Sequence, residues 1–181
     1  YWLMIHVAVI VASYGPFALG FILGCVSLLL MLFTNENNKK KMELNIKELT
    51  YINEMALTVG LVLLTIGNFL GGQWANESWG RYWGWDPKET WALISIMVYA
   101  FVIHMRFVPA LRGLWIYNLM SVLAFYSIMM TYFGVNFYLS GLHSYAKGDQ
   151  VVTPSFIWIS VGTIALLASL AFYKYKKYYK K

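Results

Sequence analysis

Three histidines and one tryptophan-rich stretch are the residues of this chain whose types and spacing suit chemistry. An imidazole nitrogen binds metals and also exchanges protons near neutral pH. Residues 79–91 read WGRYWGWDPKETW and hold four tryptophans, with Trp74 just upstream. Membrane-edge anchoring rarely needs five indoles within so short a stretch, although tryptophan belts are common there. Their large flat faces therefore indicate a flat and apolar ligand.

The same stretch contains the signals of a helix start. Asp86 suits the N-cap, Pro87 suits the first helical position, and Glu89 stands three residues after the cap, as in a capping box. We therefore expect a helix to begin at Pro87 and to hold Trp83 and Trp85 just before its first turn.

The elements that must position these residues are membrane spans. The chain has 181 residues, of which 60% are hydrophobic and only 12% are charged, and this composition predicts an all-α polytopic membrane protein. Gly15-Pro16 divides a first apolar run that is too long for one span of about 20 residues. We expect an outer segment at residues 1–14, followed by five transmembrane helices and an external Trp-rich loop after the second. The expected spans are residues 16–33, 51–70, 87–107, 114–133 and 154–173.

The basic residues predict the orientation of these spans. The net charge of +6 does not indicate nucleic acid, because the cations sit in short loops and in the C-terminal tail. Most lie on one side of the expected membrane, which the positive-inside rule makes cytoplasmic. The Trp-rich loop and loop 134–153 then face outward. The cations of the cytoplasmic side are Lys39, Lys40, Lys41, Lys47, Arg106, Arg112, Lys174, Lys176, Lys177, Lys180 and Lys181.

The three histidines differ in expected depth. His6 precedes the Gly15-Pro16 break and His143 lies in the second outer loop, so both fall on the side of the Trp-rich loop. His104 lies about 24 Å along the third span from Lys88, and an ionisable residue within a span is a functional candidate. Plain structural roles stay open for all three, because loop histidines are often surface groups and His104 is close to the membrane interface.

Taken together, two outward histidines and an aromatic shelf suit haem, with imidazoles on the iron and indoles on the macrocycle. Arg81 and Lys88 are then placed to meet the negatively charged propionates. An aromatic belt at the interface remains the alternative explanation for the same residues.

The motif WGRYWGWDPKETWALI resembles the tryptophan-rich WWD signature of haem-handling proteins, and most closely that of the system II cytochrome c synthases of the CcsA or ResC type. Ile96 departs from a tryptophan that is frequent in that family. The residues that match the signature are Trp79, Gly80, Trp83, Trp85, Asp86, Pro87, Lys88, Glu89, Thr90 and Trp91.

The resemblance implies a role in cytochrome c biogenesis, with haem b as substrate. His6 and His143 are similar to the two external iron ligands of that family, and His104 to its intramembrane haem ligand. In such a synthase, haem crosses the membrane and rests on the Trp-rich platform. The thiols of an apocytochrome C-x-x-C-H segment then add to the vinyl groups, an activity described as cytochrome c haem lyase or synthase.

The resemblance also implies partners beyond this chain. These are apocytochrome c, a thiol-reducing pathway, and an upstream or separate membrane partner with an external domain. We expect the 181 residues to form a single haem-handling domain that is a fragment of a longer chain or fusion. The expected location is the bacterial cytoplasmic membrane, or alternatively a thylakoid membrane.

Three other functions remain open from sequence. A system I relative would bind or export haem as a chaperone without attaching it. An electron-transfer cytochrome b would need histidines paired at equal depth, and only His104 lies within an expected span. A transporter or receptor would use the aromatic stretch only as an interfacial belt.

Overall fold

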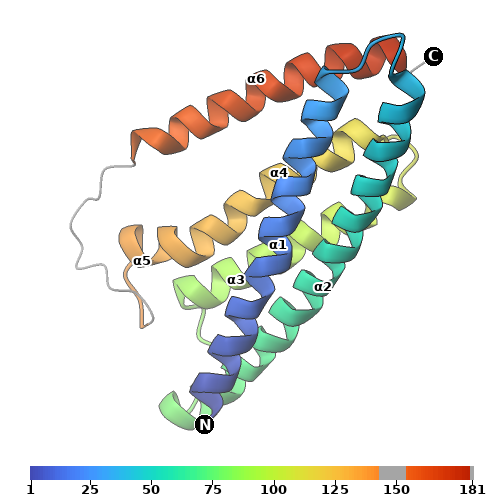
Figure 1. Ribbon diagram of the computed structural model, residues 1–181. Helices are drawn as coiled ribbons and strands as arrows, with labels where there is room; N and C mark the ends of the chain where they lie inside the picture. Colours follow the sequence, from blue (N-terminus) through green and yellow to red (C-terminus); the bar gives the residue numbers. More distant parts are fainter. Residues whose placement is uncertain (143–153, 180–181) are drawn as a thin grey trace.

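The computed structural model describes residues 1–142 and 154–179, and these residues are helical apart from short connections (Figure 1). Five helical segments in the described ranges are long and apolar enough to cross a membrane, which confirms the predicted all-α polytopic class. The elements are α1 (Trp2–Leu32), α2 (Lys39–Trp79), α3 (Pro87–His104), η1 (Met105–Phe107), α4 (Leu114–Met129), η2 (Met130–Gly134), α5 (Val135–Tyr138) and α6 (Ser155–Tyr178).

The predicted break at Gly15-Pro16 is wrong, because α1 continues through Pro16 as one helix of 31 residues. Proline removes one backbone hydrogen bond, but transmembrane helices tolerate this loss where neighbouring helices pack around it. Ser13 and Phe17, on either side of Pro16, are both fully buried in the bundle. Residues 1–14 are therefore the first turns of the helix rather than a separate outer segment.

Helix α2 is much longer than the predicted span at 51–70. Its 41 residues rise about 61 Å, roughly twice the thickness of a bilayer's hydrocarbon core. No proline interrupts it, and an ion pair between Lys47 and Glu43 at 2.7 Å supports its polar first turns. The helix ends only at Gly80, which adopts a left-handed conformation with φ 68°. Trp74 and Trp79 consequently lie on a helix and not in a loop.

The fourth span is also longer than predicted, because α4 continues through the π-helical turn η2 into α5. At η2 the Thr131 hydroxyl donates to the backbone carbonyls of Trp91 at 3.1 Å and Ser127 at 2.8 Å. Single π turns within α-helices are frequent at functional sites. This turn ties the end of the fourth span to the first turns of α3.

The bundle core is built around close aromatic packing between α1 and α3. Phe17 stacks on Tyr99 with ring centroids 3.9 Å apart, and both side chains are fully buried. Near the end of the bundle where α4 begins, Asn118 of α4 donates to Thr50 of α2 at 2.7 Å, and Asn53 of α2 donates to Ser121 of α4 at 2.9 Å. Buried amide and hydroxyl pairs of this kind join helices in a membrane, where the apolar faces alone do not select a partner.

Helix α6 packs on α1 and α4 and leaves much of its surface exposed (Figure 1). In the part of the chain that the structure describes, two side-chain hydrogen bonds join it to α4. The Trp115 indole donates to the Ala168 carbonyl at 3.0 Å, and the hydroxyls of Tyr126 and Ser160 lie 2.9 Å apart.

Candidate functional site

The Trp-rich loop, residues 80–86, joins α2 to α3 and holds its two tryptophan rings at right angles. Trp83 and Trp85 have ring centroids 5.8 Å apart and planes at 90°. Trp85 is 70% exposed and has φ 58°, a left-handed conformation that is uncommon outside glycine. Backbone strain of this kind clusters at ligand-binding sites, where the surrounding structure maintains it.

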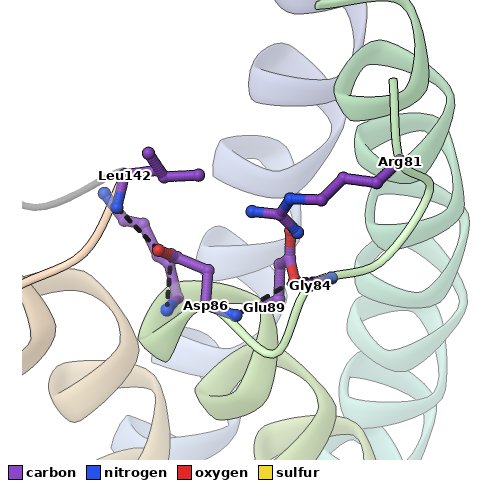
Figure 2. Close-up of polar contacts among 6 residues, drawn as sticks. Arg81, Gly84, Asp86, Glu89 and Leu142 are labelled. Atoms are coloured by element: carbon purple, nitrogen blue, oxygen red, sulfur yellow. Dashed lines mark hydrogen bonds and ion pairs between the residues drawn. The ribbon is translucent and has the colours of Figure 1, made fainter. Parts of the chain in front are cut away.

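The start of α3 holds this loop in place through two acids (Figure 2). The predicted capping box is confirmed: the Asp86 side chain caps the first turn of α3, and Glu89 accepts from the Asp86 backbone N–H at 3.2 Å. The same Glu89 oxygen also accepts from the Gly84 N–H at 2.8 Å. Its second oxygen lies 3.7 Å from a guanidinium nitrogen of Arg81. One carboxylate therefore contacts three parts of the loop.

His6 lies on the first turns of α1, beside the C-terminal end of α2. Its ring stacks on Trp74, with centroids 5.3 Å apart and planes 23° from parallel, and only 7% of the residue is exposed. The Nδ1 atom donates to the Trp2 carbonyl at 3.1 Å. In a neutral imidazole this bond leaves the lone pair on Nε2. Metal-binding histidines in proteins are commonly oriented through their second nitrogen in this way.

A cavity of about 220 Å³ opens beside His6. It brings together α1, the end of α2, the Trp-rich loop, the start of α3 and the π turn η2. The lining is mainly aromatic and apolar, and among the described residues two charged side chains reach it, Lys88 and Glu89. Its aromatic walls are Tyr14, Trp74, Tyr82, Trp83 and Tyr132. Tyr82 is fixed by a hydrogen bond from its hydroxyl to the Phe69 carbonyl of α2 at 2.8 Å.

Of the two cations expected near the site, Lys88 reaches the cavity and Arg81 does not. The Lys88 ammonium donates to the Asn136 side chain of α5 at 3.0 Å. The Arg81 guanidinium lies 5.6 Å from the ring centroid of Trp79 and close to Glu89. Within the described ranges, Lys88 therefore lines the cavity, whereas Arg81 lies beside Trp79 and Glu89.

The histidines, tryptophans and charged residues that the sequence predicts at the haem site are only partly brought together. His6, Trp83 and Lys88 line the cavity, whereas Trp79, Arg81, Trp85, Asp86 and Trp91 are not among its described lining residues. Trp79 instead packs edge-on against Trp74 at 4.6 Å. His143 lies outside the described residues.

His104 is the last of the 18 residues of α3. It lies about 26 Å from the first residue, Pro87, which is near the cavity. Its side chain is exposed, and its Nδ1 donates to the Ala100 carbonyl at 2.7 Å, which leaves the lone pair on Nε2. An ion pair between Glu54 and Arg106 joins α2 to η1 at this end of the bundle.

Sequence reasoning missed several residues of the site. The sequence marks Trp74 by its type, but its stacking on His6 depends on the extension of α2 beyond the predicted span. Tyr132 and Asn136 carry no recognisable signal in the sequence, because only the packing of the fourth span against α3 brings Tyr132 to the cavity and Asn136 to Lys88. The sequence predicts a capping role for Glu89, but not its contacts with Gly84 and Arg81.

Comparison with known proteins identifies the family of this chain. Residues 1–143 match the family described as cytochrome C assembly protein. The chain belongs to this family. Proteins similar to this chain include Protein NrfI of Wolinella succinogenes, 54% identical over 151 residues, and the cytochrome c biogenesis protein CcsA of Chlamydomonas reinhardtii, 39% identical over 145 residues. A CcsA of Prochlorococcus marinus is 36% identical over 166 residues.

The chain spans only part of the length of these relatives. The matches cover 83% of this chain but 17% of NrfI, and 80% of this chain but 40% and 53% of the two CcsA proteins. The family relationship confirms the resemblance to CcsA-type proteins drawn from the WWD motif.

The residues present at the cavity fit a haem. His6, whose orientation is set by the Trp2 carbonyl, would serve as an iron ligand, and Trp74 and Trp83 would supply flat apolar faces. Lys88 supplies a cation of the kind that binds carboxylates. The cavity is smaller than the roughly 300–1,000 Å³ of pockets that enclose small-molecule ligands. Only one part of a macrocycle fits within it, and the rest must extend beyond the cavity.

Proposed function

We propose that this chain binds haem at the cavity beside His6 and presents it for thioether attachment to apocytochrome c. The observation that carries the proposal is the meeting of His6, Trp74, Trp83 and Lys88 around one cavity in a protein of the cytochrome C assembly family. Histidine, indole faces and a cation match the iron, the macrocycle and the propionates in turn.

Each of these side chains has a distinct task in the proposal. His6 ligates the iron through Nε2, with its ring held by Trp74 and by the Trp2 carbonyl. Lys88 binds a propionate, and Asn136 restricts the position of its ammonium. Arg81 supports the loop through Glu89 instead of contacting the ligand. His143 is the second axial ligand, as the family resemblance implies.

Bound haem supplies the two vinyl groups that react with the cysteines of a C-x-x-C-H segment. The chain's contribution is positioning, since holding two reactive partners in place removes much of the entropic cost of their encounter. A shallow cavity suits this task because it leaves one edge of the macrocycle accessible to the apocytochrome. Exposed Trp85 lies on the loop that borders this edge, and we assign it to contact with the macrocycle or the incoming peptide.

His104 is proposed as a haem contact on the route across the membrane. It is exposed at the end of α3 remote from the cavity, and in the neutral imidazole the bond from Nδ1 to Ala100 leaves Nε2 as the metal-binding nitrogen. Its exposed position suits a site completed by a residue from outside this region. The relatives extend well beyond the part that this chain matches, and this further part would supply such a residue.

We further infer that the cavity faces the outer side of the membrane. The positive-inside rule supports this orientation, because Lys39, Lys40, Arg106 and Lys177 lie near the helix ends that are opposite to the cavity. The proposed partners are apocytochrome c, the remaining part of the synthase and a thiol-reducing pathway. The proposed location is a bacterial cytoplasmic membrane, with a thylakoid membrane as the alternative.

The test compares haem retention and attachment in the protein expressed with the remaining part of the synthase. We expect His6→Ala to change the optical spectrum of the bound haem and to reduce maturation of a reporter cytochrome c at least about tenfold, with partial recovery on added imidazole. A His104→Ala variant should lower the amount of haem acquired. Full maturation in the His6→Ala/His143→Ala double variant would overturn the proposal. Haem retention without any attachment would favour the chaperone function of system I relatives.

A further inference from the structure

Asp86 connects two segments that are far apart in sequence (Figure 2). One carboxylate oxygen accepts from the Lys88 backbone N–H at 3.2 Å, which caps α3. The other accepts from the Leu142 backbone N–H at 2.7 Å, although Leu142 lies 56 residues away. Asp86 is only 6% exposed. Its two oxygens therefore serve the start of α3 and the end of segment 139–142 at the same time.

Segment 139–142 approaches the start of α3 so closely that a side chain at its third position has no room. A Cβ atom on Gly141 would lie 2.5 Å from the Asp86 carboxylate and 2.8 Å from the Pro87 ring. Real Cβ atoms do not approach other atoms so closely, so glycine is needed at this point. A second bond, from Lys88 to Asn136, holds the preceding helix α5 against the same turn of α3.

Capping of α3 alone does not account for an aspartate at this position. Serine and asparagine cap helices about as well as aspartate. A single hydroxyl oxygen next to the Cβ could cap the helix but could not also reach Leu142. Two oxygens at the end of a longer side chain are needed to hold both N–H groups, and a buried carboxylate is tolerated when its oxygens are hydrogen-bonded.

We propose that Asp86 is a positioning residue that sets the place of segment 139–142 relative to the Trp-rich loop. The bond between Asp86 and Leu142, with the close approach of Gly141, forms the Asp86–Leu142 link. Leu142 directly precedes His143 in the chain. The inference therefore rests on the proposed function, in which His143 ligates the iron, and it gives Asp86 a role in that ligation without contact with haem.

Two variants break the link from opposite sides. Asp86→Ser keeps a capping oxygen for α3 but loses the contact with Leu142. Gly141→Ala keeps the Asp86 carboxylate that caps α3, but its Cβ collides with Asp86 and Pro87 and forces the segment away from the start of α3. Gly162→Ala is the matched control, because a Cβ on Gly162 meets no atom within 4 Å.

The first measurement is hydrogen exchange of the Leu142 amide, which does not depend on haem. Hydrogen bonds to charged acceptors are strong enough that we expect exchange to accelerate about tenfold or more in Asp86→Ser and Gly141→Ala. The Gly162→Ala control should exchange as the parent does. Equal exchange rates in the parent and in both link variants would overturn the proposal.

The second measurement is iron ligation in the haem-loaded protein with the rest of the synthase. Both link variants should change the optical spectrum in the same way and lower attachment about tenfold, and added imidazole should restore part of the attachment. Faster Leu142 exchange with parental spectra and attachment would also overturn the positioning role. A parent that holds no haem would instead contradict the proposed function, while the exchange experiment would still decide whether the link exists.

Discussion

Replacing Glu89 should release the Trp-rich loop from the start of α3. One oxygen of this side chain accepts from the N–H groups of Gly84 and Asp86, and the other lies 3.7 Å from Arg81. Glu89→Ala removes all three contacts. Glu89→Gln keeps one carbonyl oxygen, which is able to replace the oxygen that holds both N–H groups, but it removes the negative charge beside Arg81.

The expected costs follow from these contacts. Hydrogen bonds to charged acceptors contribute about 1.5–3 kcal/mol each, and neutral ones about 0.5–1.5 kcal/mol. The Gly84 bond is exposed, so the lower values apply. Loss of two such bonds in Glu89→Ala then costs about 3 kcal/mol, and their weakening in Glu89→Gln costs about 1–2 kcal/mol. The ion pair with Arg81 adds less than about 1 kcal/mol, since Arg81 is partly exposed.

Thermal unfolding of the purified protein in detergent measures these differences. For a chain of this length, 1 kcal/mol shifts Tm by roughly 2–4 °C. We therefore expect Tm to fall by about 6–12 °C in Glu89→Ala and by about 2–8 °C in Glu89→Gln. Amide exchange at Gly84 and Asp86 should accelerate in the alanine variant.

The matched control is Glu77→Ala, which removes an acid from the last turns of α2, just before the Trp-rich loop. Among the described residues, Glu77 accepts one exposed hydrogen bond, from Gln73 at 3.2 Å. Its replacement should leave Tm within about 2 °C of the parent, because surface substitutions rarely exceed 0.5 kcal/mol. Equal Tm values and equal Gly84 exchange in Glu89→Ala and Glu77→Ala would refute the assigned role of Glu89.

Three further changes test other contacts. Trp74→Leu removes the ring stacked on His6. Since an aromatic pair contributes roughly 0.5–1.5 kcal/mol, the affinity for haem in a haem titration should fall about 2–10-fold. Lys88→Met replaces the charged side chain by an uncharged one of similar length. This change should weaken binding of haem by about tenfold but leave binding of a propionate-esterified porphyrin unchanged. Asn118→Leu removes the bond to Thr50 and should lower thermal stability by about 0.6–1.7 kcal/mol without changing the haem spectrum.

Opposite results would contradict these assignments. Parental haem affinity in Trp74→Leu would separate Trp74 from the ligand site, and an equal loss for haem and its ester in Lys88→Met would indicate a general packing defect. A changed haem spectrum in Asn118→Leu would contradict its assignment to helix packing, since Asn118 is fully buried between α2 and α4.

Local signals in the sequence predicted local structure well. The Asp86, Pro87 and Glu89 pattern located the start of α3 and its capping box, because capping involves residues within four positions of each other. Turn signals were less reliable. Pro16 did not end α1, since packing of Ser13 and Phe17 in the bundle outweighed the loss of one backbone hydrogen bond.

The sequence by itself determined the membrane class, the approximate spans, the helix start at Pro87 and, through the WWD motif, the family. Tertiary structure alone decided that His6 stacks on Trp74, that Lys88 reaches Asn136 and that Asp86 bonds to Leu142. The physical reason is that apolar spans carry little information about which face meets which neighbour. The rotation and length of each helix set these contacts, and they appear only when the whole bundle is packed.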